Sequence, residues 1–205
     1  MRVLHIIGSP KGEDSTSTRV ALAFLDAYQQ AHPDHEVKTL DVWTEDLPPF
    51  GRELATAKLA PLVGERRTPQ QEEAWRAVEA VVADFAGYDK IVISTPMWNF
   101  GLPYELKHYI DLIVQPGLTF GMNAAFEHIG LLEDRPVQLV LSRSSPLPEN
   151  SPEDFQHPYL KHILGFIGLH DIRTLVIEGT TLPQPAREQL VDEFCESARS
   201  AAIKF

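Results

Sequence analysis

Hydrophobic positions along the chain form short runs that alternate with longer segments of helical periodicity. The short runs have the length of β-strands and lie at residues 3–7, 37–42, 91–93, 137–141 and 175–177. Four of them carry apolar residues at successive positions, which is typical of parallel strands that are covered by helices on both faces. The run at 37–42 is more polar and predicts an edge strand. Strands that alternate with helices indicate a parallel α/β protein.

Apolar residues between these runs recur at helical spacing and form five stripes. The stripes are Val20, Phe24, Ala27 and Ala31; Trp75, Val78, Val82 and Phe85; Leu106, Ile110 and Ile113; Phe155, Tyr159, Ile163 and Phe166; and Leu190, Phe194, Ala198 and Ala202. Thr68, Pro69 and Gln71 form a capping-box signature before the second stripe, and Gly87 is a stop signal after it. Residues 151–152 are expected to open the fourth helix.

Five strands with intervening helices leave few arrangements, because parallel crossovers are right-handed. We expect a single domain over residues 1–205. It should be a three-layer sandwich whose five-stranded parallel sheet has the order 2-1-3-4-5, with helices on both faces. Two long irregular stretches remain, at 43–67 and 116–135, and loops of this length are usually functional or hold short extra elements.

Ligands of an open parallel sheet bind beyond the carboxyl ends of the strands, near the point where the strand order reverses. The loop after the first strand, residues 8–18, is rich in hydroxyl groups and leads into a helix. Its candidate ligands are Ser9, Ser15, Thr16 and Ser17. Free N–H groups and a positive dipole end at a helix start suit a phosphate. The alternative, an ordinary Ser/Thr cap on a polar loop, fits the same spacing.

The loops after the third and fourth strands hold a second and a third group of candidates. The third strand is followed by Pro96, Met97, Trp98, Asn99 and Phe100. The fourth is followed by Ser142, Arg143, Ser144 and Ser145. A stiff loop with aromatic side chains can line a planar heterocycle, and small polar residues can bind its polar end. Both loops could equally be packing turns.

The chain lacks the sequence motifs of several other kinds of active site. The phosphate loop GxxxxGK[ST], the dinucleotide fingerprint GxGxxG and the hydrolase elbow GxSxG are all missing. The only cysteine, Cys195, lies on the stripe of the last helix, where a core thiol is expected rather than a nucleophile. No histidine pair has a persuasive metal-ligand spacing, so no metal site is expected.

The charge balance and the apolar runs limit the classes of partner that are expected. The 29 acidic and 18 basic residues differ by 11, which gives a net charge of −11 and argues against a nucleic-acid partner. No run approaches the roughly 20 apolar residues of a membrane span, so no membrane partner is expected. A single cysteine suits a reducing compartment, and we expect a cytoplasmic protein.

Taken together, these loops resemble one family, the FMN-dependent NADH azoreductases and NAD(P)H quinone reductases of flavodoxin-like fold. The resemblance rests on Ser9 with residues 15–17, on the run Met97, Trp98, Asn99 and Phe100, and on residues 142–145. It continues through residues 103–111 and 116–120, and covers nearly the whole chain in register. Trp98 stands where the family usually has Tyr, and Ser144 and Ser145 replace two glycines.

The resemblance implies an FMN-dependent oxidoreductase that is a homodimer with one FMN per subunit. Its phosphate would be held by the hydroxyls of the first loop, and its ring by residues 96–100 and 142–145. NADH or NADPH would donate a hydride, and quinones or aromatic azo compounds would accept it in a ping-pong sequence. Trp98 and Phe120 would line the substrate slot. An electron-carrier flavodoxin and a flavin reductase that releases reduced FMN remain as alternatives.

Overall fold

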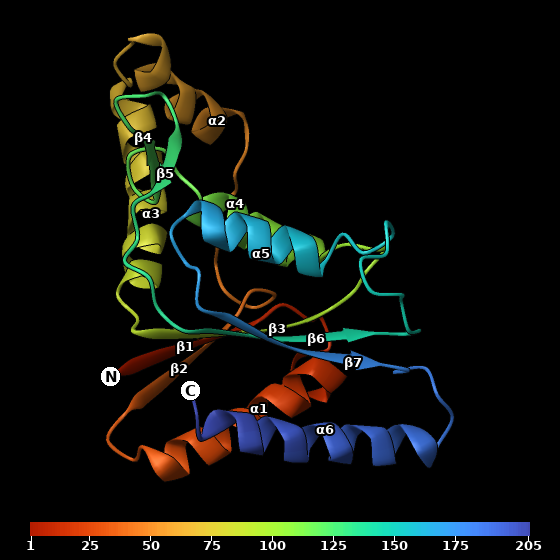
Figure 1. The fold of residues 1–205 in the computed structure, drawn as a ribbon. Helices are drawn as coiled ribbons and strands as arrows, with labels where there is room; N and C mark the ends of the chain where they lie inside the picture. Colours follow the sequence, from red (N-terminus) through yellow and green to blue (C-terminus); the bar gives the residue numbers. More distant parts are fainter.

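A five-stranded parallel sheet runs through the centre of the computed structural model, which describes residues 1–205 (Figure 1). Its strands are β1 (Arg2–Ile7), β2 (Glu36–Asp41), β3 (Lys90–Pro96), β6 (Val137–Arg143) and β7 (Ile172–Glu178). They are hydrogen-bonded in the order β2-β1-β3-β6-β7, which confirms the predicted order 2-1-3-4-5. The polar strand β2 lies at an edge, also as predicted.

Helices cover both faces of the sheet because neighbouring strand residues point to opposite faces. α1 (Thr16–Ala31) and α6 (Ala186–Ala202) pack on one face, against Val3 and Val92. On the other face lie α3 (Pro69–Ala86), α4 (Tyr104–Ile113) and α5 (His157–Phe166). The strand residues that follow Val3 and Val92 point toward these three helices. Cys195 of α6 is only partly buried and packs at the edge of the core between α1 and α6, and burial raises the pKa of its thiol.

Helix α3 begins and ends where its sequence signals predict. The Thr68 hydroxyl accepts the N–H of Gln71, and the Gln71 side chain accepts the N–H of Thr68, which completes the capping box. Pro69 occupies the first turn, and Gly87 follows the last residue. All four apolar residues of the predicted stripe are buried.

The predicted start of α5 at residues 151–152 is wrong. The helix begins at His157, because a carboxylate oxygen of Asp154 accepts the N–H groups of both Gln156 and His157. Phe155 lies outside the helix and is 63% exposed instead of inward. The fully buried residues of the helix are Leu160 and Leu164, so the true inward stripe is shifted from the predicted one.

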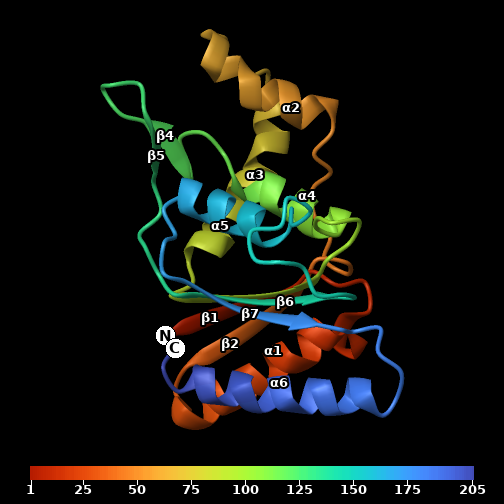
Figure 2. The ribbon, with the colours of Figure 1, turned by 45° about the vertical axis from the view of Figure 1, so that its right-hand side comes forward.

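Both long irregular stretches contain short elements, as predicted. The first holds α2 (Arg52–Leu59) and a 3-10 helix, Ala60–Val63, and the second holds the antiparallel pair β4 (Phe120–Met122) and β5 (His128–Gly130). These elements and the far end of α3 project from the three layers (Figures 1 and 2). The α2 helix is attached through a small core in which Leu54 packs with Trp75.

Two further findings concern the whole chain. None of its helices has the length and apolar character that crossing a bilayer requires. The amino and carboxyl termini lie side by side in both views of the ribbon, at the same end of the sheet (Figure 2). The loops at the carboxyl ends of the strands therefore gather at the other end, where the sequence places the candidate residues.

Candidate functional site

Loops from four sheet strands border one cleft of about 400 Å³ at the carboxyl ends of the sheet. The volume falls in the range of about 300–1,000 Å³ that is usual for ligand sites. The cleft is lined by Ser9, Pro10, Lys11, Asp14, Ser15, Thr16, Arg19, Pro96, Met97, Trp98, Ser142, Arg143, Ser144, Thr180, Thr181, Arg187 and Val191. It reaches from the start of α1 to the loops after β3 and β6, so residues from opposite ends of the sequence share one space.

At one end of the cleft, helix α1 starts without a side-chain cap. Ser15 occupies the capping position, but its hydroxyl lies 3.1 Å from the Ser17 hydroxyl and forms no bond with the helix backbone. The first intrahelical bond is donated by Arg19, which leaves the N–H groups of Thr16, Ser17 and Thr18 without a partner in the chain. Uncapped N–H groups beside hydroxyls form an anion site.

The loop between β1 and α1 is held tightly against the sheet. The Ser9 hydroxyl is buried and accepts the N–H of Lys11 at 3.3 Å. Gly8 donates its N–H to the carbonyl of Ser94 at 2.8 Å, and a Cβ at Gly8 would lie only 2.8 Å from the Leu106 side chain. A larger residue at this position would require the Leu106 and Thr95 side chains to shift, so the loop leaves the sheet in close contact with both.

A buried polar chain lies behind this loop. The His5 ring nitrogen Nε2 lies 3.0 Å from the Ser94 hydroxyl, which in turn lies 3.4 Å from the Thr18 hydroxyl. His5 is fully buried, and burial lowers its pKa to about 4 because the charged imidazolium would be desolvated. The imidazole is therefore neutral at pH 7, and it connects the middle of the sheet with the first turn of α1.

The loop after β3 contains a tight turn with unusual backbone angles. Trp98 and Gly101 exchange two backbone hydrogen bonds, of 3.1 and 2.8 Å. Between them, Asn99 and Phe100 have φ angles of 46° and 67°, a region that a bulky residue such as Phe rarely adopts. Residues held in such conformations cluster at functional sites. The N–H groups of Asn99 and Phe100 form no hydrogen bond in the chain and are free to donate to a ligand.

The loop after β6 is joined to its neighbours through Arg143. The guanidinium forms ion pairs of 2.9 Å with Asp154 and 2.8 Å with Glu178, and the side chains of Arg143 and Asp154 are each only 12% exposed. Asp154 belongs to the segment before α5, where the N–H of Phe155 donates to the carbonyl of Phe100. Arg143 thus connects the loop after β6 with the segment before α5, which is bonded to the loop after β3. Two carboxylates balance the charge of Arg143.

Positive side chains surround the anion end in spite of the net charge of −11. Arg19 pairs with Glu188 at 2.8 Å, and this hydrogen bond raises the pKa of Arg19. Lys11 and Arg187 line the cleft without an ion pair. Asp14 is the acidic residue of the lining, and the two positive side chains that form no ion pair, Lys11 and Arg187, are the ones available to a phosphate.

Most of the predicted cofactor residues meet in this cleft. Those that line it are Ser9, Ser15, Thr16, Pro96, Met97, Trp98, Ser142, Arg143 and Ser144. Those just outside its lining are Ser17, Asn99, Phe100 and Ser145, which lie in the same loops. The residues come together because all three loops leave the same edge of the sheet.

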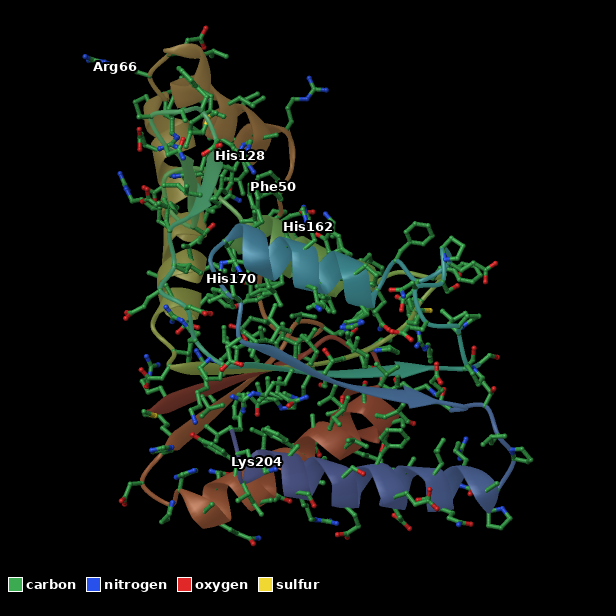
Figure 3. All side chains as sticks on the ribbon, in the orientation of Figure 1. Phe50, Arg66, His128, His162, His170 and Lys204 are labelled. Atoms are coloured by element: carbon green, nitrogen blue, oxygen red, sulfur yellow. The ribbon has the colours of Figure 1, made fainter.

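Phe120, the predicted wall of the substrate slot, does not reach the cleft of its own chain. It lies on β4, 4.7 Å from the Phe166 ring and 6.1 Å from the His128 ring, measured between ring centroids. Figure 3 labels His128 high on the projecting part, away from the loops at the carboxyl ends of the strands. Within one chain, the hairpin and the cleft are therefore separate.

Sequence reasoning missed the contribution of the fifth sheet strand. Thr180 and Thr181 come just after β7 and line the cleft, together with Arg187 at the start of α6. The N–H groups of Gly179 and Thr180 both donate to the carbonyl of Arg143. The other loops were found because they begin at the carboxyl end of a sheet strand, and the same criterion applied to β7 would have found these residues too.

Comparisons with known proteins identify the family and the fold of the chain. A family model described as flavodoxin-like fold matches residues 1–201. An FMN-dependent NADH:quinone oxidoreductase of Nitratidesulfovibrio vulgaris (strain DP4) is 44% identical over 99% of both chains. The chain belongs to this family of FMN-dependent NADH:quinone oxidoreductases with a flavodoxin-like fold. FMN-dependent NADH:quinone oxidoreductase 9 of Burkholderia lata is 37% identical over 97% of this chain and 99% of its own.

Solved structures of this family have the same fold. The azoreductase of Bacillus anthracis (strain Sterne) superposes with a TM-score of 0.87 at 28% identity, and both chains are covered completely. The azoreductase AzrA gives a TM-score of 0.88 at 27% identity, again over the full length of both. Both superpositions cover the whole chain, the projecting part included.

Proposed function

We propose that this protein is an FMN-dependent oxidoreductase that transfers electrons from NADH to quinones and aromatic azo compounds. One observation carries the proposal: the uncapped start of α1 and the loops after β3 and β6 border the same cleft. FMN has an anionic tail and a flat ring, and this cleft has an anion site at one end and a stiff aromatic loop at the other. The names of the full-length relatives support the same function.

The residues present fit each part of FMN. Ser9, Ser15, Thr16 and Ser17, with the free N–H groups of the first turn, would hold the phosphate. Residues 96–100 would line one edge of the ring, where the free N–H of Asn99 and its unpartnered amide can orient it. The residues 142–145 would meet the opposite side, although the Arg143 charge is already balanced by Asp154 and Glu178.

The residues of the chain would bind and orient FMN and its substrates and exclude side reactions. The reaction needs no nucleophile from the protein. When bound, FMN supplies the redox chemistry, which is acceptance of a hydride from the nicotinamide and its delivery to the acceptor. Trp98 is 41% exposed and lines the cleft, where it would offer an apolar surface to a flat substrate. We propose that donor and acceptor use this slot in turn, in a ping-pong sequence.

We also propose a homodimer, because only a second subunit could bring Phe120 to a cleft. The projecting part exposes large apolar side chains, namely Leu59, Leu62, Val63, Met122 and Phe126. Exposed apolar patches of this kind mark association surfaces. Cytoplasmic location, which the single cysteine favours, also stays a prediction.

Steady-state oxidation of NADH by the purified protein tests the proposed function. We expect turnover with menadione and with an azo dye, without added FMN. An electron carrier would oxidise no NADH with any quinone or dye. A flavin reductase would need added FMN, and its rate would rise with FMN concentration. Either result would contradict the proposal.

A further inference from the structure

Trp43 joins three parts of the rim of the cleft, and the proposed function assigns it no role. It lies in the turn after β2, and its indole is half-buried. The indole N–H donates to the carbonyl of Gly8 at 3.2 Å, directly before the phosphate loop. The ring centroid lies 6.0 Å from that of Trp98 and 4.9 Å from that of Tyr104, the first residue of α4.

The backbone that carries Trp43 is fixed by Asp41. The Asp41 carboxylate accepts the N–H of Trp43 at 3.0 Å, and the Asp41 carbonyl accepts the N–H groups of Thr44 and Glu45. The N–H of Val42 donates to the carbonyl of Ile7, which ties the turn to the end of β1. The position of Trp43 is therefore set by the sheet and not by the loop alone.

The acceptor of the indole N–H is equally fixed. The Gly8 N–H donates to the Ser94 carbonyl of β3, and Gly8 packs closely against the side chains of Leu106 and Thr95. Trp43 is thus held at its backbone and at the far side of its ring. Two such attachments leave the indole little freedom, so it can act as a rigid support for a neighbour.

Trp98 is the neighbour that needs support. It lines the cleft, is 41% exposed, and has Trp43 tilted against it at an interplanar angle of 58°. An exposed indole without a packed neighbour populates several rotamers, and a substrate that stacks on it must restrict them. A tilted aromatic pair at this centroid distance favours one orientation of the exposed ring.

We propose that Trp43 is a positioning residue that holds Trp98 in one orientation, and that this pair makes the slot selective for flat aromatic acceptors over compact, non-planar ones. The second half of this inference rests on the proposed function, whereas the first half concerns only the chain. Trp43 does not itself line the cleft, so it acts through Trp98.

Nuclear magnetic resonance of the indole N–H groups tests the pair in the protein as purified. The chain has three tryptophans, so three indole signals are expected. Trp43→Leu should shift the Trp98 signal and lower its heteronuclear NOE, because the ring current and the restraint are both lost. Trp98→Tyr should shift the Trp43 signal. The buried Trp75 lies in the core under α2 and serves as the internal reference.

Kinetics test the consequence for selectivity. In Trp43→Leu, we expect the KM for menadione to rise about two- to tenfold relative to the KM for ferricyanide, a compact acceptor that does not stack. Trp43→Phe keeps a ring but lacks the donor to Gly8, and it should restore part of the ratio. Trp75→Phe is the matched control, which should keep both the Trp98 signal and the ratio of the two KM values.

Two results would overturn the inference. An unchanged Trp98 signal and NOE in Trp43→Leu would show that Trp43 does not hold Trp98. An unchanged KM ratio in a variant whose Trp98 signal has shifted would show that the pair does not set selectivity. If the unmodified protein oxidises no NADH with any acceptor, the proposed function and the selectivity fail together, but the indole signals still decide the pairing.

Discussion

At the residue scale, the hydroxyl groups at the start of α1 differ from ordinary helix caps. Ser15 stands at the capping position, yet its hydroxyl contacts Ser17 rather than a backbone N–H. A side chain that does not cap leaves the helix end to a ligand. The sequence could name these residues, but could not tell a capped helix from an open one, because the difference lies in one side-chain rotamer.

Ser15→Ala should weaken FMN binding. Loss of a charge-assisted hydrogen bond costs about 1–3 kcal/mol, and a second loss in the double variant with Ser17→Ala should add to it. Titration of FMN fluorescence against each variant measures the change in Kd. Ser197→Ala, on the exposed side of α6, is the control. Equal FMN affinity in the double variant and the unmodified protein would remove the phosphate assignment.

His5 gives the protein a specific dependence of stability on pH. Its pKa is lowered to about 4 in the folded state, against about 6.5 in an unfolded chain, so the unfolded state binds more protons between these values. The free energy of unfolding should therefore fall as the pH drops from 6.5 to 4, by about 3 kcal/mol for this group. Above pH 6.5 the contribution is fully present.

Urea unfolding between pH 4 and pH 7 measures this contribution. His5→Leu should show a flatter dependence on pH than the unmodified protein, because it has no proton to bind at this position. His162→Gln, which removes an exposed imidazole on α5, should keep the slope of the unmodified protein. A His5→Leu variant with the full slope would refute the assignment to His5.

At the scale of elements, the order of strands and the ends of α3 could be read from the sequence because their causes are local. Alternating apolar runs produce the sheet, and Thr68 with Gln71 forms a cap from neighbouring residues. The start of α5 could not be read in this way. Asp154 accepts the N–H groups of Gln156 and His157 at its beginning, and Asp154 is also paired with Arg143, which lies on a strand distant in sequence.

The Arg143 ion pairs should matter for the segment between β6 and α5. Asp154→Asn removes one of the two carboxylates that pair with Arg143 and leaves Glu178 in place, and loss of one hydrogen bond between charged groups costs about 1.5–3 kcal/mol. Asp154→Asn should therefore lower the free energy of unfolding and speed hydrogen exchange in residues 144–156. Denaturant titration and exchange mass spectrometry measure the two effects.

An exposed ion pair provides the comparison. Arg199 pairs with Glu196 on the surface of α6, where loss of the partner costs at most about 1 kcal/mol. Arg199→Gln should leave exchange in residues 144–156 unchanged. If Asp154→Asn behaves like Arg199→Gln, the pair is not what holds this segment.

At the scale of the whole molecule, the cleft and the projecting part form two separate surfaces. The cleft collects polar and positive residues, whereas the projection exposes apolar ones such as Phe126, which is 82% exposed. The sequence indicated that the long loops would be functional or hold short extra elements, but not that they would project away from the sheet. The direction of α2 depends on its packing against α3, and that of the β4–β5 hairpin on its packing against α5, neither of which a local pattern encodes.

Sedimentation should find a dimer of the 23.0 kDa chain. Phe126→Glu places a charge on the apolar projection and should shift the protein toward monomer, with a loss of quinone turnover if Phe120 of one subunit serves the other. Ile203→Glu is a matched change at an exposed apolar residue after α6 and should keep the dimer. A monomeric unmodified protein would contradict the dimer.

The cleft at the carboxyl ends of the sheet is central to all of these expectations, and the absorption spectrum of the protein tests it most directly. The purified protein should show flavin bands in the visible region. NADH added without oxygen should bleach them, and menadione should restore them. A colourless protein that takes up no added FMN, or bound flavin that NADH does not bleach, would contradict the account.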